Sequence, residues 1–326
     1  MARIGVIGGG AFGTAMACVL RRSRHEVTLW AREPEVAASL NGQRANPLFL
    51  PGVALEPGIE ATADLAAAAR DRDFLLIAVP AQHVRSIART LRDALAPGTP
   101  VVSCSKGIER ESCALMPEVL AETLPGSPVA VLSGPSFARE IAADLPCGVA
   151  LACADLRLAR SLAASIANPR FCVQPEDDVP GAAIGGVMKN VIAIAVGVAA
   201  GRRLGENARA TLVTLGLAES MRLGLAKGAR AATFMGLSGI GDLMLTAASL
   251  QSRNTSLGVA LGEGGAPDEA LNGRRHVTEG FYSAQAVVAL GRRLAVAMPV
   301  AEAVDSVLSR RASVDTAIQR LIDNAG

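Results

Sequence analysis

A long apolar segment at residues 182–201 constrains the fold of this 326-residue chain more than any other feature. Its sequence is AAIGGVMKNVIAIAVGVAAG, in which Lys189 is the only charged residue. A segment of this length could span a lipid bilayer. The adjacent Lys189 and Asn190 near its middle, together with its glycines, argue against a membrane location. We therefore predict a helix buried in a protein core and no integral membrane segment.

Lys189 itself has two interpretations. Burial disfavours the charged ammonium, so the side chain could lie at a rim with its stem buried and its amine in water. Alternatively, the helix carries the amine into a cleft, where burial and neighbouring groups tune its pKa for proton transfer. We favour the second interpretation, which makes Lys189 a candidate catalytic residue.

The N-terminal residues predict a dinucleotide-binding βαβ unit. A β-rich run at residues 3–7 ends in a G-x-G-x-x-G pattern at Gly8, Gly10 and Gly13, and a helical pattern over 14–22 and a strand over 26–30 follow. In such units the glycines permit a tight turn, close approach of the backbone to a pyrophosphate, and close packing of the helix on the strand. The helix N-terminus then offers N–H groups to the phosphates. The alternative is a purely structural glycine turn.

The end of the second strand bears on the choice of cofactor. An NAD-selective site usually places Asp or Glu there, about 20 residues after the glycines, to bind the ribose 2′-hydroxyl. This chain has Arg32 at that point, and a guanidinium suits a 2′-phosphate, so we favour NADP(H). Glu33 follows directly, so NAD(H) is also possible.

Helices and strands continue to alternate up to residue 174, which predicts an α/β fold with a mainly parallel, doubly wound sheet. The connection at 41–60 is too long and too rich in Pro and Gly for a plain loop, and is either a lid or an irregular excursion. The further elements that we predict are helices at 61–70, 81–95, 113–124, 136–143 and 155–167, and strands at 73–79, 100–104, 128–132, 148–153 and 171–174.

Two strand ends carry polar residues where such sheets bind ligands. Lys106 follows one strand within Ser-Lys-Gly, and Ser133-Gly134-Pro135-Ser136 forms a tight turn before a helix. Ser136 could simply cap that helix. A lysine beside a serine-glycine turn favours an anion or hydroxyl site.

The periodicity changes after Pro180, and we find no strand pattern beyond residue 175. The chain is therefore predicted to divide into a cofactor-binding domain at 1–179 and an all-α substrate and catalytic domain at 180–326. The predicted helices of the second domain cover 207–226, 230–237, 240–250, 254–262, 281–294, 300–309 and 313–323.

Two polar stretches stand out in the second domain. Asp242 follows two glycines at a helix start, where it could simply complement the helix dipole. Ser252-Arg253-Asn254 precedes another helix and combines a guanidinium, an amide and N–H groups, which suits a phosphate. The three histidines show no partner pattern and are expected to be structural or surface residues.

Composition and charge exclude several classes of function. The 32 basic and 30 acidic residues are interspersed and give a net charge of +2, so nothing indicates nucleic-acid binding. The six cysteines are scattered without a C-x-x-C pair, which favours buried thiols in a reducing compartment over a metal site or disulfides. The N-terminus enters a strand directly and shows no signal peptide, so we expect a cytoplasmic protein.

Several ordered motifs resemble those of the bacterial NAD(P)-dependent sn-glycerol-3-phosphate dehydrogenases, and the resemblance covers nearly the whole chain. It implies a Rossmann-type sheet followed by an all-α domain like the C-terminal domain of 6-phosphogluconate dehydrogenase, and a homodimer. The motifs are GGGAFGT at 8–14, WAR at 30–32, FLPG at 49–52, SKG at 105–107, SGPSFARE at 133–140, KNVIAIAVG at 189–197, NARATLVTLGLAE at 207–219, FMGLSGIGDLMLT at 234–246, SRN at 252–254 and MPVAEAV at 298–304.

The resemblance also implies a reaction and a set of site residues. The reaction is reversible hydride transfer between sn-glycerol 3-phosphate and glycerone phosphate, which supplies phospholipid backbones, with Lys189 as proton acceptor and donor. The chain departs from the family pattern at Ala11–Phe12, where many relatives have Ser and an aromatic residue, and in the loosely matched VTEG at 277–280. The implied substrate positions are Lys106, Gly134, Ser136, Lys189, Asp242, Ser252, Arg253 and Asn254, and the implied cofactor positions are Ala11, Phe12, Arg32, Lys106, Ala138, Arg253, Val277 and Glu279.

The chemistry of the residues agrees with this reaction. Oxidation of a secondary alcohol needs a base for the O–H while the hydride leaves to nicotinamide. We expect Lys106 to support the reacting oxygen or the primary hydroxyl, and Asp242 to orient Lys189 and set its pKa. Arg253 and Asn254 would hold the phosphate.

Two other functions stay open. One is a dehydrogenase of another small substrate, such as a β-hydroxyacid, on the same plan. The other is a non-catalytic NADP(H)-binding sensor. The predicted phosphate site argues against the first, and the set of Lys106, Lys189 and Asp242 argues against the second.

Overall fold

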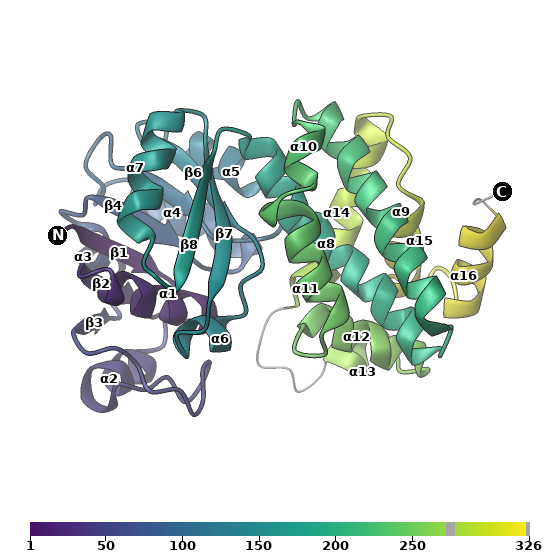
Figure 1. Ribbon diagram of the computed structural model, residues 1–326, viewed down its shortest axis with the longest axis horizontal. Coiled ribbons are helices and arrows are strands. Elements are labelled where there is room, and N and C mark those ends of the chain that lie inside the picture. Colours follow the sequence, from purple (N-terminus) through teal and green to yellow (C-terminus); the bar gives the residue numbers. More distant parts are fainter. Residues whose placement is uncertain (272–277, 324–326) are drawn as a thin grey trace. The chain divides into compact units, whose positions relative to one another are not determined.

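The computed structural model describes residues 1–271 and 278–323. The chain divides into two compact units (Figure 1). The first comprises Met1–Ser105 and Met116–Val179, and the second comprises Lys106–Leu115 and Pro180–Gly326. No single boundary in the sequence therefore separates the two units, because a short segment of the N-terminal half belongs to the second unit.

The first unit is built on one eight-stranded sheet in the order β3-β2-β1-β4-β5-β6-β7-β8. All neighbouring strands are parallel except β6 and β7, which are antiparallel. The central strand β4 is buried along its whole length, as expected when helices cover both faces of a parallel sheet. The predicted doubly wound α/β fold is confirmed. The strands are β1 Arg3–Ile7, β2 Glu26–Trp30, β3 Ile59–Thr62, β4 Phe74–Ile77, β5 Val101–Ser103, β6 Val129–Ser133, β7 Cys147–Cys153 and β8 Phe171–Glu176.

The helices of this unit depart from prediction mainly at residues 34–70. Pro34–Gln43 forms an unpredicted helix, and the predicted helix at 61–70 is instead a strand, β3, followed by a short helix. Asp64 separates the two, because its side chain accepts hydrogen bonds from the Ala66 and Ala67 N–H groups and caps the helix. The helices are α1 Ala11–Arg22, α2 Pro34–Gln43, α3 Leu65–Ala69, η1 Ala81–His83, α4 Val84–Leu91, α5 Met116–Thr123, α6 Ala138–Ala142 and α7 Leu156–Ile166.

The long connection between α2 and β3 is fastened to the rest of its unit. Arg22, at the end of α1, pairs with Glu56 at 2.7 Å and donates to the backbone oxygens of Ile141 and Ala142 in α6. Arg139 of α6 donates to the Pro51 oxygen at 2.9 Å. Two arginines thus join this connection to α1 and α6, which favours the irregular excursion over a free lid.

The second unit is helical and is built around α8, Val179–Gly201. Most of its residues are buried, as predicted for the apolar segment. By length and composition, α8 and the segment Ala231–Ala248 could each cross a membrane, but 89% of the α8 window is buried inside the protein. The other elements are α9 Gly205–Ala226, α10 Ala231–Phe234, η2 Leu237–Gly241, α11 Asp242–Ala248, α12 Arg253–Gly262, the unpredicted α13 Pro267–Leu271, α14 Glu279–Arg293, α15 Pro299–Leu308 and α16 Val314–Asp323.

Helices α8 and α12 contact each other through glycines. A Cβ added at Gly197 would lie 2.2 Å from the Thr255 oxygen, and one at Gly258 would lie 2.1 Å from the Ile194 oxygen. Gly201 and Gly262, one turn further along, face each other in the same way. Only residues without a side chain allow two helix backbones to approach so closely.

A buried glutamate joins α9 to the start of α15. Glu219 is fully buried and accepts hydrogen bonds from the backbone N–H groups of Val300 at 2.5 Å and Ala301 at 3.2 Å. These N–H groups belong to the first turn of α15, and N–H groups in the first turn of a helix have no hydrogen-bond acceptor within that helix. Desolvation raises the pKa of Glu219 to about 7 against the lowering effect of these two hydrogen bonds.

Candidate active site

Two lysines and one aspartate form a buried cluster in the second unit. Lys189 Nζ donates to Asp242 Oδ1 at 2.5 Å, and Lys106 Nζ donates to Asp242 Oδ2 at 2.8 Å. Asp242 is fully buried, and Lys189 is 9% exposed. The structure therefore brings together the three residues that the sequence predicted for proton transfer.

Glycines place Asp242 beside Lys189. Lys189 and Gly185 are four residues apart on α8 and so share one face of the helix. A Cβ at Gly185 would lie 2.2 Å from the Ser238 oxygen, so the turn that leads into α11 packs directly on α8. That turn, η2, is π-helical and contains Gly239 at φ −99°, ψ −107°. Asp242 follows as the first residue of α11 and is thereby held against the lysine.

The cluster perturbs the pKa values of its members. Desolvation and the nearby Lys106 charge lower the pKa of Lys189 to about 8, although Asp242 opposes the shift. Desolvation raises the pKa of Asp242, but the two lysines more than offset it, so its pKa lies below the usual value. Asp242 therefore stays a carboxylate at neutral pH, while Lys189 is close to the balance between amine and ammonium that acid–base catalysis requires.

Thr246 is a neighbour of Lys189 that the sequence analysis missed. Its hydroxyl accepts a hydrogen bond from Lys189 Nζ at 3.1 Å and donates to the Asp242 backbone oxygen at 2.7 Å. Because Thr246 lies one turn after Asp242 on α11, the i, i+4 spacing could have identified it.

A chain of amides links the elements around the cluster. Asn190 donates to the Lys106 backbone oxygen at 2.9 Å and accepts from Asn254 at 2.8 Å. Asn254 in turn accepts from the Gly280 N–H at 2.9 Å. The segment that carries Lys106 and the starts of α12 and α14 are thus held together through α8.

The predicted Ser-Arg-Asn phosphate site lies at the N-terminus of α12. Ser252 caps the helix by accepting from the Thr255 N–H at 3.2 Å, Arg253 is exposed at the first helical position, and Asn254 is buried. Glu279, the first residue of α14, is half-buried, whereas Val277 lies outside the described residues.

The glycine-rich turn of the first unit has the geometry that its motif predicts. Gly8 adopts φ +131°, and a Cβ at Gly13 would lie 1.9 Å from the Gly8 oxygen. A Cβ at Gly10, in contrast, would meet no atom of the described residues within 4 Å, apart from those adjoining it in the chain. The N-cap residue of α1 is Gly10, which has no side chain with which to cap the helix, and α1 begins at Ala11. The turn therefore leaves open the space in which a pyrophosphate would lie, and the residues fit a dinucleotide.

Two other predicted positions of this unit lie at strand ends. The Arg32 side chain is 72% exposed and pairs with Glu33 at 2.7 Å, just after β2. Gly134 follows β6 at φ +139°. The Ser136 hydroxyl donates to the Gly134 oxygen at 2.7 Å, within the turn. The N-cap residue of α6 is Phe137, so the expectation that Ser136 occupies that position was wrong. Ala138 begins α6.

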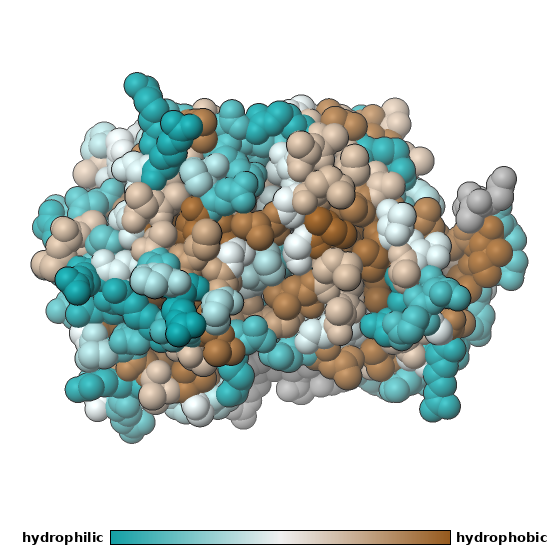
Figure 2. All heavy atoms as spheres, in the orientation of Figure 1, coloured by the Kyte–Doolittle hydropathy of each residue, from teal (hydrophilic) through white to brown (hydrophobic). Residues whose placement is uncertain are grey.

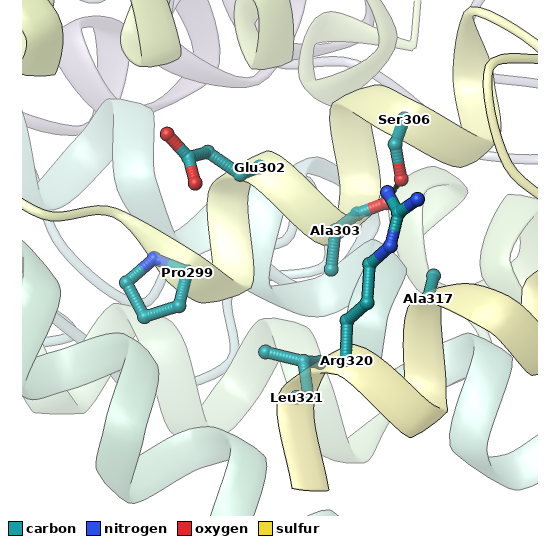
Figure 3. A pocket seen from close by; sticks show the side chains of 7 residues that line it. All are labelled: Pro299, Glu302, Ala303, Ser306, Ala317, Arg320 and Leu321. Carbon is teal, nitrogen blue, oxygen red and sulfur yellow. Dashed lines mark hydrogen bonds between the residues drawn. The ribbon is translucent and has the colours of Figure 1, made fainter. Parts of the chain in front are cut away.

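His25 has a structural role, as expected. Its Nδ1 accepts from the Ala2 N–H at 3.0 Å, and its Nε2 lies 2.7 Å from the Ser165 oxygen. A small pocket of the second unit lies between α15 and α16 and contains none of the predicted site residues (Figure 3). Its lining residues are Pro299, Glu302, Ala303, Ser306, Ala317, Arg320 and Leu321.

A Rossmann-type unit with an open glycine turn and a helical unit with a buried lysine–carboxylate cluster are the features of a two-domain NAD(P)-dependent oxidoreductase. Comparisons with known proteins narrow this class. Residues 3–159 match the family model of the NAD-dependent glycerol-3-phosphate dehydrogenase N-terminus, and residues 178–319 match that of its C-terminus. The chain belongs to the NAD-dependent glycerol-3-phosphate dehydrogenase family.

Individual relatives agree with this assignment. The chain is 53% identical to glycerol-3-phosphate dehydrogenase [NAD(P)+] of Rhodospirillum rubrum over 98% of this chain and 91% of the relative. It is 51% identical to the Caulobacter vibrioides enzyme of the same name, over 98% and 96%. The crystal structure of glycerol-3-phosphate dehydrogenase from Coxiella burnetii matches with a TM-score of 0.94 at 36% identity, over 98% of both chains.

Proposed function

We propose that this chain is a glycerol-3-phosphate dehydrogenase that interconverts sn-glycerol 3-phosphate and glycerone phosphate with NADP(H) or NAD(H). The observation that carries the proposal is the bridge from Lys189 through Asp242 to Lys106, with a Lys189 pKa of about 8. Family membership supplies the substrate, and this cluster supplies a group able to move the proton.

The first unit mainly binds the cofactor and the second mainly binds the substrate, and each also supplies residues to the other task. Residues 1–179 bind the cofactor, which takes up or delivers the hydride when it is bound. Residues 180–326 bind the substrate, together with the segment 106–115 that packs with them. Within the first unit, Gly8, Gly10, Ala11, Phe12, Gly13, Arg32 and Ala138 serve the cofactor, and Gly134 and Ser136 serve the substrate. Lys106, Arg253, Val277 and Glu279 complete the cofactor set.

Lys189 acts as base in oxidation and as acid in reduction. Neutral Lys189 accepts the proton of the secondary hydroxyl, and protonated Lys189 returns a proton to the oxygen on which negative charge develops. Asp242 orients the Lys189 amine, and Lys106 adds positive charge beside that oxygen. Ser252, Arg253 and Asn254 hold the phosphate, whose binding energy positions the reacting carbon.

The cofactor preference and the cellular context follow from the same proposal. Arg32 favours NADP(H), and its pairing with Glu33 leaves room for NAD(H). We place the enzyme in the cytoplasm, where it supplies sn-glycerol 3-phosphate for glycerophospholipid synthesis.

We also propose a homodimer. The second unit exposes several large apolar side chains, and apolar surface gathers over α10 and α11 (Figure 2). Extended apolar surface is typical of interfaces. Sedimentation velocity of the purified chain tests for the dimer. A purely monomeric species at micromolar concentration would contradict the proposed homodimer. The exposed side chains are Leu204, Leu215, Leu225, Met235, Met244, Leu250 and Ile322.

The deciding experiment is NADPH consumption by the purified protein with glycerone phosphate, repeated with NADH and with unphosphorylated dihydroxyacetone. Turnover that requires the phosphate supports the proposal, and the ratio of the two cofactors tests Arg32. Cofactor binding without turnover would favour a sensor. Turnover with a β-hydroxyacid and none with glycerone phosphate would favour the other dehydrogenase.

A further inference from the structure

A buried asparagine in the long connection between α2 and β3 contacts the glycine-rich turn. Asn46 is fully buried. Its Nδ2 donates to the Gly9 backbone oxygen and to the Thr14 hydroxyl, each at 2.8 Å, and its Oδ1 accepts from the Phe49 N–H at 3.1 Å. Both protons of the Nδ2 group are thus used, and the opposite amide orientation would set a donor against the Phe49 N–H.

These contacts fix the peptide between Gly9 and Gly10. A trans peptide is planar, so its C=O and N–H groups point in opposite directions, and the described chain contains no cis bond. Because Asn46 holds the Gly9 oxygen inside the protein, the Gly10 N–H points to the other side. Space beside this peptide is open as well, since a Cβ built on Gly10 would meet no described atom within 4 Å beyond the residues adjoining it in the chain.

The preceding part of the turn is held as well. The Gly8 N–H donates to the Trp30 oxygen at 3.1 Å, and a Cβ at Gly9 would lie 2.6 Å from the Ala31 Cβ. Gly9 is therefore enclosed between the end of β2 and Asn46. Glycine has little conformational preference of its own, so a Gly8-Gly9-Gly10 turn depends on such outside contacts to keep one peptide orientation.

We propose that Asn46 is a positioning residue for the dinucleotide: it holds the Gly9 carbonyl inward so that the Gly10 N–H faces the pyrophosphate. The inference rests on the proposed function of the first unit as the cofactor-binding unit. It also assigns a role to the long connection, which delivers one amide to the back of the phosphate-binding turn.

The side chain needed here must donate twice to oxygen. Asn46→Ala leaves the buried Gly9 oxygen only the longer hydrogen bond from the Thr14 hydroxyl, at 3.4 Å, which favours rotation of the peptide toward water. Asn46→Asp replaces the Nδ2 group by a carboxylate oxygen, which accepts from the Thr14 hydroxyl but repels the Gly9 carbonyl oxygen. Both variants are expected to turn the Gly10 N–H away from the ligand.

The test measures NADPH binding by calorimetry in the wild type, Asn46→Ala, Asn46→Asp and the control Asn41→Ala. Asn41 is a matched control because its amide also makes two backbone hydrogen bonds at 2.8 Å, but to Ala61 in β3. We expect the Kd of NADPH to rise about tenfold or more in both Asn46 variants, as for the loss of a hydrogen bond to a charged group, and to stay unchanged in Asn41→Ala.

Two further measurements separate positioning from a loss of general stability. At saturating NADPH, the KM for glycerone phosphate should stay within twofold of the wild type in Asn46→Ala. Competition by adenosine 2′-monophosphate, which lacks the pyrophosphate, should also be unchanged, whereas a merely structural role would weaken both ligands together. Unchanged NADPH affinity in Asn46→Ala, or equal weakening of both ligands, would overturn the inference. A wild type that does not bind NADPH would instead overturn the proposed function.

Discussion

The two units form their functional regions by opposite means. The glycine-rich turn of the first unit works through missing side chains, since Gly8, Gly10 and Gly13 leave room for backbone and ligand. The cluster of the second unit works through side chains whose charges are buried, with Asp242 between Lys106 and Lys189. The first region should therefore be sensitive to added atoms, and the second to removed charges.

The largest effect should come from removing the proton-transfer group. Lys189→Ala is expected to lower kcat about a thousandfold, within the usual range for loss of a general acid or base, and to leave the Kd of NADPH unchanged. Steady-state kinetics and calorimetry measure the two quantities. Lys227→Ala, a lysine outside the cluster, is the control. Near-normal turnover in Lys189→Ala would remove this residue from its role.

A second test changes the charge beside that lysine. In oxidation, which uses neutral Lys189, kcat/KM should rise with pH and level off above about 8, and in reduction, which uses the protonated form, it should fall above about 8. Asp242 raises the Lys189 pKa, so Asp242→Asn should move both inflections to lower pH. An opposite charge at this range commonly shifts a pKa by about 1–3 units, so the protonated fraction of Lys189 at neutral pH, and with it the rate of reduction, should fall about 2- to 100-fold.

The matched control for this test is Asp305→Asn, which removes a buried carboxylate that pairs with Arg311 elsewhere in the second unit. Its inflections should match the wild type. An inflection that stays in place in Asp242→Asn would show that another group titrates in these profiles.

The contrast between the units can be sharpened by adding one methyl group at either of two glycines. Gly13→Ala should destabilise the fold by about 1–3 kcal/mol, because the new Cβ would lie 1.9 Å from the Gly8 oxygen. Gly10→Ala should leave the melting temperature nearly unchanged and weaken NADPH binding about tenfold, because only a ligand would occupy that space. Thermal melts and calorimetry give both quantities. Normal cofactor affinity in Gly10→Ala would place the pyrophosphate elsewhere.

The smallest effect is expected at the exposed Arg32. Arg32→Ala should lower the preference for NADPH over NADH by several-fold, because it removes one solvent-exposed contact between charged groups, and such contacts contribute little free energy. Glu33→Gln should raise that preference slightly, because it releases Arg32 from its partner. The ratio of kcat/KM for the two cofactors measures both changes, and a ratio unaffected by Arg32→Ala would dismiss the 2′-phosphate contact.

The same difference between the units explains what could be predicted from the sequence. The glycine turn is a local motif, so its strand, turn and helix were identified from adjacent residues. Lys189 was identified because a single charge interrupts an apolar helix. The pairing of Lys189 with Asp242, in contrast, was expected from a family resemblance, because residues far apart in sequence meet only after folding.

Features that depend on tertiary contacts were not predicted from the sequence. Helix α2 and strand β3 lie in a region where Pro and Gly obscure the periodicity, and β3 is a short edge strand that pairs with β2 alone among the described strands. That residues 106–115 pack with the second unit has no local sequence signal. The role of Asn46 depends on its contact with Gly9, which sequence spacing does not reveal.

The glycine contact between α8 and α12 has an evolutionary consequence. In an ordinary helix pair, a larger side chain on one helix can be tolerated if its neighbour on the other becomes smaller. At Gly197, Gly201, Gly258 and Gly262 the neighbour is already the smallest residue, so no compensating replacement exists. We therefore expect these four glycines to be retained in relatives while the surrounding residues diverge. The distance between the helix that carries Lys189 and the helix that begins with Arg253 would then stay the same.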